Sequence, residues 1–163
     1  MNEIDTLVAQ LKTELCQKHL KLAVAESLTS GKLQAALGSI SGASEFFEGG
    51  ITVYSLKQKI NLLNLDKSLV LAVNGVSATV AEQMAKAVAE KFAVNLAIST
   101  TGYAEPCPAQ QIDHPIAYIA LWHQQTPVKT MQINGQGLDR HAMQNLVVKT
   151  ALIALLNYIQ TQL

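Results

Sequence analysis

Short apolar runs alternate with helical patterns along most of this 163-residue chain, and that alternation restricts the possible fold more than any other feature. Residues 22–27 (LAVAES) and 94–102 (VNLAISTTG) are nearly continuous apolar runs, which predict buried strands. Residues 51–55 (ITVYS) are β-branched and aromatic, and they predict another strand. Strands that alternate with helices in this way are typical of the α/β class.

The helical segments are recognised by their periodicity. Between residues 3 and 19 apolar residues recur at the spacing of one helix face, at Ile4, Leu7, Val8, Leu11 and Leu15. Further helices are predicted over 30–40, entered through Thr29 or Ser30, and over 57–63 and 140–158. Residues 77–92 predict a helix capped by Ser77.

The last two strands are predicted to form an antiparallel hairpin over 116–123 (IAYIALWH) and 128–134 (VKTMQIN). Before them, residues 103–115 form a polar, proline-bearing loop of a length that is usually functional or mobile. A mixed sheet with helices on both faces is therefore expected. The length suits one domain over residues 1–163.

Composition excludes several classes of function. The formal net charge is zero and the basic residues are spread thinly, so we expect no nucleic-acid partner, whereas near-neutrality favours self-association. No run approaches the roughly 18 apolar residues of a membrane helix, and the N-terminus lacks a secretory signal, so we predict a cytoplasmic protein without a membrane partner. Cys16, Cys107 and the four histidines lack metal-site spacing, and neither a dinucleotide nor a P-loop motif is present.

Three polar segments follow the predicted strands, at 26–31 (ESLTSG), 54–59 (YSLKQK) and 100–106 (TTGYAEP). In open α/β sheets ligands bind beyond the carboxyl ends of the strands, so these segments are expected to converge on one site. Helix capping is the alternative explanation for the serines and threonines.

In this order the segments ESLTSG, GGITVYSLKQK, GVS, TTGYAEP and HPIAYIALW resemble the CinA C-terminal domain family, which includes the bacterial nicotinamide-nucleotide amidases. The resemblance covers about residues 22 to 140. It implies a three-layer α/β/α sandwich with a mixed, mostly parallel sheet and a C-terminal hairpin, commonly assembled as a homodimer. It also implies hydrolysis of the carboxamide of nicotinamide mononucleotide, or of a related amide, to a carboxylate and ammonia, without a metal or a cofactor.

Carried over residue by residue, the resemblance makes Ser27 the nucleophile, Lys59 its base and Tyr54 a third catalytic residue. A serine hydroxyl needs a base, and a lysine can serve if burial lowers its pKa. Backbone N–H groups of residues 28–31 are the expected oxyanion donors. The candidate substrate-binding residues are Glu26, Thr29, Ser30, Gly31, Thr101, Gly102 and Arg140.

Structural roles remain open for several of these residues. Glu26 could anchor its loop, and Thr29 could cap a helix. Gly102 suits a tight loop that needs a positive φ, whereas Arg140 could form a surface ion pair with Asp139 or an earlier acid.

The sequence also departs from the family pattern at Leu28, Ser30, Glu105, His114, Gln144 and Asn145. Glu105 replaces a glycine, and the changes at 114, 144 and 145 remove positive charge, which weakens the expected phosphate site. Two hypotheses follow. The chain is an amidohydrolase of the family, or it is a catalytically inactive, regulatory paralogue that keeps the dimeric scaffold and binds a nucleotide.

Overall fold

The computed structural model describes residues 2–163, which form six α-helices, two 3-10 helices and five strands within that range. The helices are α1 (Glu3–Gln17), α2 (Lys32–Gly38), α3 (Leu56–Leu63), α4 (Lys67–Ala72), α5 (Ala78–Lys91) and α6 (Arg140–Gln162). The strands are β1 (Leu22–Glu26), β2 (Phe47–Thr52), β3 (Leu96–Tyr103), β4 (Ile116–His123) and β5 (Thr126–Asn134). Short 3-10 helices lie at Ala43–Glu45 and Pro108–Gln110.

The five strands form one mixed sheet in the order β2-β1-β3-β4-β5. β1 pairs in parallel with β2 on one side and β3 on the other, and the β3-β4 and β4-β5 pairings are antiparallel. Four strands therefore point in one direction and only β4 opposes them. This arrangement brings the carboxyl ends of the parallel strands β1, β2 and β3 to the same edge of the sheet.

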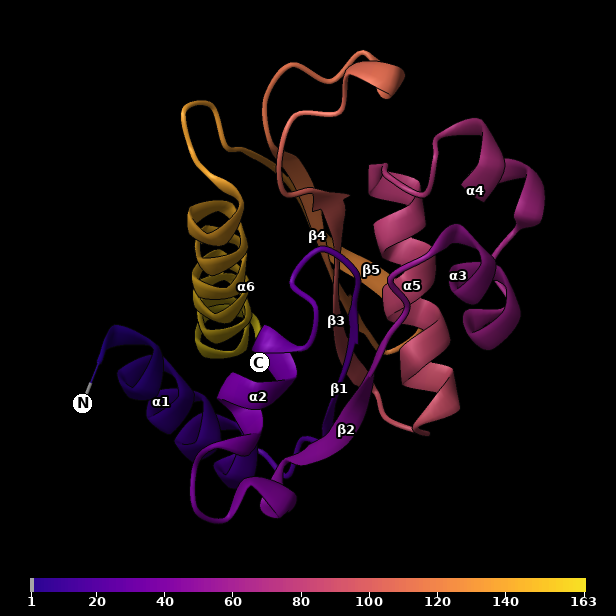
Figure 1. Cartoon of the computed structure of the whole chain (residues 1–163). Helices are drawn as coiled ribbons and strands as arrows, with labels where there is room; N and C mark the ends of the chain where they lie inside the picture. Colours follow the sequence, from indigo (N-terminus) through magenta and orange to yellow (C-terminus); the bar gives the residue numbers. More distant parts are fainter. Residues whose placement is uncertain (1) are drawn as a thin grey trace.

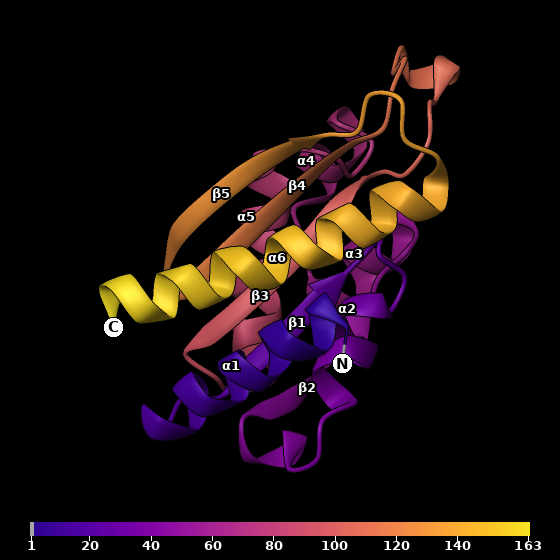
Figure 2. The ribbon, with the colours of Figure 1, turned by 90° about the vertical axis from the view of Figure 1, so that its left-hand side faces the viewer.

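Helices cover both faces of the sheet, with α1, α2 and α6 on one side and α3, α4 and α5 on the other (Figures 1 and 2). Each face of the sheet has its own hydrophobic core, and alternate residues of β1 belong to different cores. Leu22 and Val24 pack in the core under α1, α2 and α6, whereas Ala23 and Ala25 pack in the core under α3, α4 and α5. This two-sided burial explains the continuous apolar runs of the sequence. The predicted three-layer α/β/α fold is confirmed.

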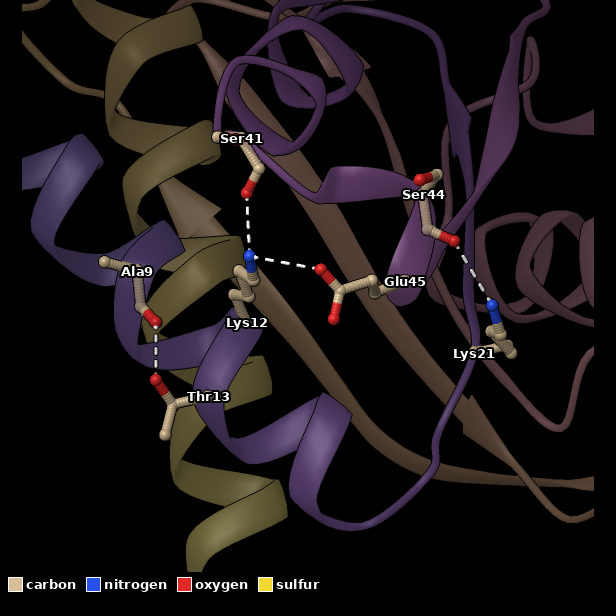
Figure 3. Close-up of polar contacts among 7 residues, drawn as sticks. All are labelled: Ala9, Lys12, Thr13, Lys21, Ser41, Ser44 and Glu45. Atoms are coloured by element: carbon tan, nitrogen blue, oxygen red, sulfur yellow. Dashed lines mark hydrogen bonds and ion pairs between the residues drawn. The ribbon is translucent and has the colours of Figure 1, made fainter.

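Polar contacts fix the first helix to the segment that precedes β2. The Lys12 amine donates to the Ser41 carbonyl at 2.8 Å and lies 3.5 Å from the Glu45 carboxylate, while Lys21 reaches the Ser44 carbonyl at 3.2 Å (Figure 3). The α1 helix begins with a capping box formed by Asn2 and Asp5. The edge of the sheet at β2 is thereby attached to the layer formed by α1.

The long C-terminal helix α6 is apolar and long enough to cross a membrane by those two measures alone. In the fold, however, 56% of its most apolar window is buried, and the helix packs on α1 and on the sheet. This burial is what the core helix of a compact α/β fold requires.

The predicted bounds of the second strand were wrong, and one short helix was missed. β2 begins at Phe47 and ends at Thr52, so Tyr54 lies outside the strand. Gly49 and Gly50 also lie inside β2. A Cβ at Gly49 would be 2.8 Å from the Phe92 ring and one at Gly50 would be 2.5 Å from a Val24 methyl, so both positions need glycine. Helix α4 was not predicted because its six residues are too few to show a periodic pattern.

Candidate active site

Ser27 and Lys59 meet at the carboxyl edge of the sheet. Ser27 directly follows β1, and Lys59 lies in α3, the helix that follows β2. The Lys59 amine donates to the Ser27 hydroxyl at 2.8 Å and to the Val53 carbonyl at 3.2 Å. Both side chains are almost wholly buried, with Ser27 5% and Lys59 3% exposed. The predicted meeting of these two groups, which are 32 residues apart in sequence, is therefore confirmed.

Burial changes the acid–base behaviour of Lys59. Desolvation by burial lowers the pKa of its amine from 10.5 to about 8. At pH 7 roughly a tenth of such an amine is neutral, and at pH 8 about half is neutral. A neutral amine can accept the proton of the neighbouring serine hydroxyl, so the pair has the geometry and the pKa of a nucleophile with its base.

The pair opens into a cavity of about 440 Å³, a volume within the range of small-molecule sites. Its walls come from the loop after β1, the start of α3, the segment before α5, the loop after β3 and the first residue of α6. The lining residues are Ser27, Leu28, Tyr54, Ser55, Leu56, Lys59, Asn74, Val76, Gly102, Tyr103, Ala104, Glu105, Pro106, Cys107 and Arg140.

Glu26 holds the start of α2 rather than facing this cavity. Its fully buried carboxylate accepts the backbone N–H groups of Gly31, Leu33 and Gln34, at 2.8 to 3.1 Å. The prediction that Thr29 or Ser30 caps this helix was wrong: Gly31 is the N-cap, without a side-chain cap of its own, and the carboxylate comes from the end of β1. Glu26 thus fixes the loop that carries Ser27.

Replacing Glu26 with glutamine is expected to lower the free energy of unfolding by about 2 kcal/mol, because one amide oxygen cannot replace a carboxylate that accepts three buried N–H bonds. Urea unfolding followed by circular dichroism would measure the change. Glu48→Gln, which removes an exposed carboxylate from β2, is the control. Equal stability of the two variants would contradict this anchoring role.

Two of the predicted substrate-binding hydroxyls, those of Thr29 and Thr101, form hydrogen bonds within the protein. The Thr29 hydroxyl bonds the Thr100 hydroxyl at 2.7 Å, and the Thr101 hydroxyl donates to the Gly75 carbonyl at 2.6 Å. Both residues are fully buried and neither lines the cavity. They connect the loops that form the cavity walls.

Gly102 lines the cavity, but the reason predicted for its presence was wrong. It lies within β3 and does not have a positive φ. A Cβ there would collide with the Ile116 carbonyl and lie 2.6 Å from the Ala117 Cα. Glycine is needed because β3 and β4 approach closely at this point.

The loop after Ser27 determines which backbone donors remain for an oxyanion. Ser30 and Gly31 have positive φ values of 53° and 92°, and their N–H groups bond the Ser27 carbonyl and the Glu26 carboxylate. Among residues 2–163, no acceptor bonds the N–H of Leu28 or of Thr29. The four predicted donors are thus reduced to Leu28 and Thr29, and Leu28 also lines the cavity.

Arg140 and Tyr54 lie on the wall of the cavity away from the lysine–serine hydrogen bond. The Arg140 guanidinium donates to the Glu105 carboxylate at 2.9 Å and also to the Tyr54 hydroxyl. Arg140 therefore has an ion-pair partner in the loop after β3, and Asp139 instead caps α6 by accepting the Ala142 N–H at 2.8 Å. Tyr54 is 53% exposed, and its hydroxyl is hydrogen-bonded to Arg140 and not to Ser27 or Lys59.

Sequence reasoning missed Asn74 and Tyr103, which also line the cavity. The Asn74 amide donates to the Tyr103 hydroxyl at 2.9 Å, joining the segment before α5 to the end of β3. Tyr103 belongs to the TTGYAEP segment, so its position among polar strand-end residues was the available signal.

The remaining departures from the family pattern have structural partners. The Gln144 amide donates to the Leu28 carbonyl at 2.8 Å, and Asn145 accepts from the Lys32 amine at 3.0 Å. His114 pairs with Asp113 outside the cavity lining. Within residues 2–163 no group of three histidine, cysteine or acidic residues has the geometry of a metal site.

Comparison with known proteins identifies one family. The sequence model of the CinA C-terminal domain matches residues 4–159. A CinA-like protein of Flavobacterium psychrophilum is 39% identical over 104 residues, which cover 64% of this chain and 25% of that protein. A putative competence-damage inducible protein of Clostridium botulinum is 38% identical over 141 residues, covering 85% of this chain and 34% of its own length. The chain thus spans between a quarter and about a third of these relatives.

Solved structures show the same fold. The competence damage-inducible protein A of Klebsiella pneumoniae superposes with a TM-score of 0.93 at 23% identity, over 99% of this chain and 100% of that one. A CinA superfamily protein of Escherichia coli superposes with a TM-score of 0.89 at 25% identity, over 96% and 92% of the two chains.

Proposed function

This chain belongs to the CinA C-terminal domain family, and from that premise we propose that it is an amidohydrolase that uses Ser27 and Lys59. The substrate class is a small carboxamide of the pyridine-nucleotide kind, nicotinamide mononucleotide or a related amide, converted to the carboxylate and ammonia. The observation that carries the proposal is the 2.8 Å hydrogen bond between a buried lysine and a buried serine at the cavity wall.

In the proposed reaction the neutral Lys59 amine takes the Ser27 proton as the hydroxyl oxygen attacks the carboxamide carbon. The N–H group of Leu28, which lines the cavity, stabilises the oxyanion of the tetrahedral intermediate. The lysine ammonium then protonates the departing nitrogen, which leaves as ammonia, and an ester to Ser27 remains. A water molecule, deprotonated by Lys59, attacks this ester and releases the carboxylate and the free serine.

The proposed steps use only serine, lysine and water. The cavity walls add aromatic and polar side chains, Tyr54, Asn74 and Tyr103, that suit a planar carboxamide ligand. A cytoplasmic location and a homodimeric assembly stay predictions.

A second candidate is an inactive, nucleotide-binding paralogue, which the substitutions at Leu28, Ser30 and Glu105 favour. An assay of the purified protein distinguishes the enzyme from the inactive paralogue. It measures ammonia release from nicotinamide mononucleotide and from nicotinamide riboside, and the binding of each compound. Hydrolysis of either amide supports the enzyme, whereas binding without hydrolysis supports the paralogue.

The pH dependence is a sharper test of the base. Because only neutral Lys59 can accept the serine proton, kcat/KM is expected to rise with pH and to reach half its maximum near pH 8. Initial rates of ammonia release between pH 6 and pH 10 would measure this profile, with a thermal melt at each pH to verify folding. A rate that is constant or falls over this range would exclude Lys59 as the base.

A further inference from the structure

Little of the positive charge around the cavity is free to bind a phosphate group. Among the lining residues that the structure describes, the charged side chains are Lys59, Glu105 and Arg140. Lys59 is directed to Ser27 and to the Val53 carbonyl. Arg140 is thus the one lining cation available to a ligand elsewhere in the cavity.

The Arg140 guanidinium already has two hydrogen-bond partners within the protein. One nitrogen of its guanidinium donates to the Glu105 carboxylate at 2.9 Å, and the other donates to the Tyr54 hydroxyl. Glu105 comes from the loop after β3 and Arg140 from the start of α6, so the pair connects two walls of the cavity. A phosphate that bound Arg140 would have to displace Glu105 and would then lie close to the freed carboxylate.

Two helices begin with residues that line the cavity, α3 at Leu56 and α6 at Arg140. The first-turn N–H groups of a helix are ordinary phosphate ligands. In α6 the Asp139 carboxylate accepts the Ala142 N–H at 2.8 Å, whereas in α3 the neutral Ser55 hydroxyl accepts the Gln58 N–H at 3.3 Å. The start of α6, which carries Arg140, therefore already holds a carboxylate of the chain itself.

We propose that this site takes a carboxamide without a phosphate, of the nucleoside rather than the nucleotide class, and that Glu105 determines this choice. The inference rests on the proposed function for the carboxamide and on the Glu105–Arg140 contact for the absence of the phosphate. A nicotinamide nucleoside carries a positive ring and no dianion, so Glu105 does not repel it.

The expected size of the effect follows from Coulomb's law. A dianion about 4 Å from a carboxylate in a water-like environment is disfavoured by roughly thirtyfold in binding. The Glu105 and Arg140 side chains are 61% and 39% exposed, so salt is expected to reduce this factor.

The test measures binding separately from turnover. Calorimetric titration of the Ser27→Ala protein with nicotinamide riboside and with nicotinamide mononucleotide is expected to show at least tenfold tighter binding of the riboside. Adding Glu105→Gln is expected to bring the two dissociation constants within about threefold of each other. Glu90→Gln is the matched control, since it removes an exposed, ion-paired carboxylate from α5 outside the cavity lining.

Equal or tighter binding of the mononucleotide by the Ser27→Ala protein, or binding of neither compound, would overturn the inference. So would a preference that Glu105→Gln leaves unchanged. The proposed function fails separately: if the wild-type protein releases ammonia from neither compound yet prefers the riboside in a Glu105-dependent manner, the site selects its ligand without hydrolysing it.

Discussion

Protein carrying Ser27→Ala is expected to release ammonia on the order of a thousandfold or more slowly than the wild type, because the change removes the attacking oxygen. The cavity contains other hydroxyls, at Tyr54, Ser55 and Tyr103, but the Lys59 amine is hydrogen-bonded to Ser27. Loss of one hydrogen bond should reduce the free energy of unfolding by only about 1 kcal/mol. The measurement pairs the rate of ammonia release with urea unfolding.

Ser44→Ala is the matched control for this variant. Ser44 is an exposed serine in the 3-10 helix before β2, and its contact with Lys21 uses the backbone carbonyl, so activity and stability should be unchanged. Full activity in Ser27→Ala would place the nucleophile elsewhere in the cavity.

Lys59→Met is expected to reduce ammonia release by a similar factor, on the order of a thousandfold, since methionine fills the volume but cannot take a proton. Below pH 8 the wild-type protein must bury a charged amine, which the variant avoids. We therefore expect Lys59→Met to be at least as stable as the wild type at pH 7.

The stability difference between the wild type and Lys59→Met depends on pH because burial lowers the pKa of Lys59. Between about pH 8, the folded pKa, and 10.5, the unfolded pKa, the unfolded chain binds more protons at Lys59, so wild-type stability rises with pH. Over this range the wild type should gain up to about 3 kcal/mol relative to Lys59→Met. Urea unfolding at pH 7 and pH 10 would measure it. The control is Lys86→Met, at an exposed lysine of α5, for which no such gain is expected.

Elements with a strong local pattern were predictable from the sequence. Residues 116–123 were predicted as a strand and form β4 with those bounds, because a continuous apolar run suits a strand with neighbours on both sides. Ser77 was predicted to cap α5, and its hydroxyl accepts the Val80 N–H at 3.1 Å. Both predictions depend on neighbouring residues alone.

Contacts between distant segments were not predictable in the same way. The α2 helix begins where the Glu26 carboxylate reaches it from the preceding strand, so local capping signals at Thr29 and Ser30 indicated the wrong residue. The meeting of Ser27 and Lys59 followed from the strand-end rule together with the family resemblance. The partner of Arg140 could not be identified, because Glu105 lies 35 residues away and reaches it only through the order of the strands.

The sheet order β2-β1-β3 separates the proposed nucleophile and base from the residue proposed to select the ligand. Ser27 and Lys59 follow the neighbouring strands β1 and β2, whereas Glu105 lies in the loop after β3. An exposed position in that loop can therefore mutate without disturbing the buried proton-transfer pair. If the proposed roles hold, descendants of this scaffold can acquire new substrates through changes in one surface loop and keep the lysine–serine pair unchanged.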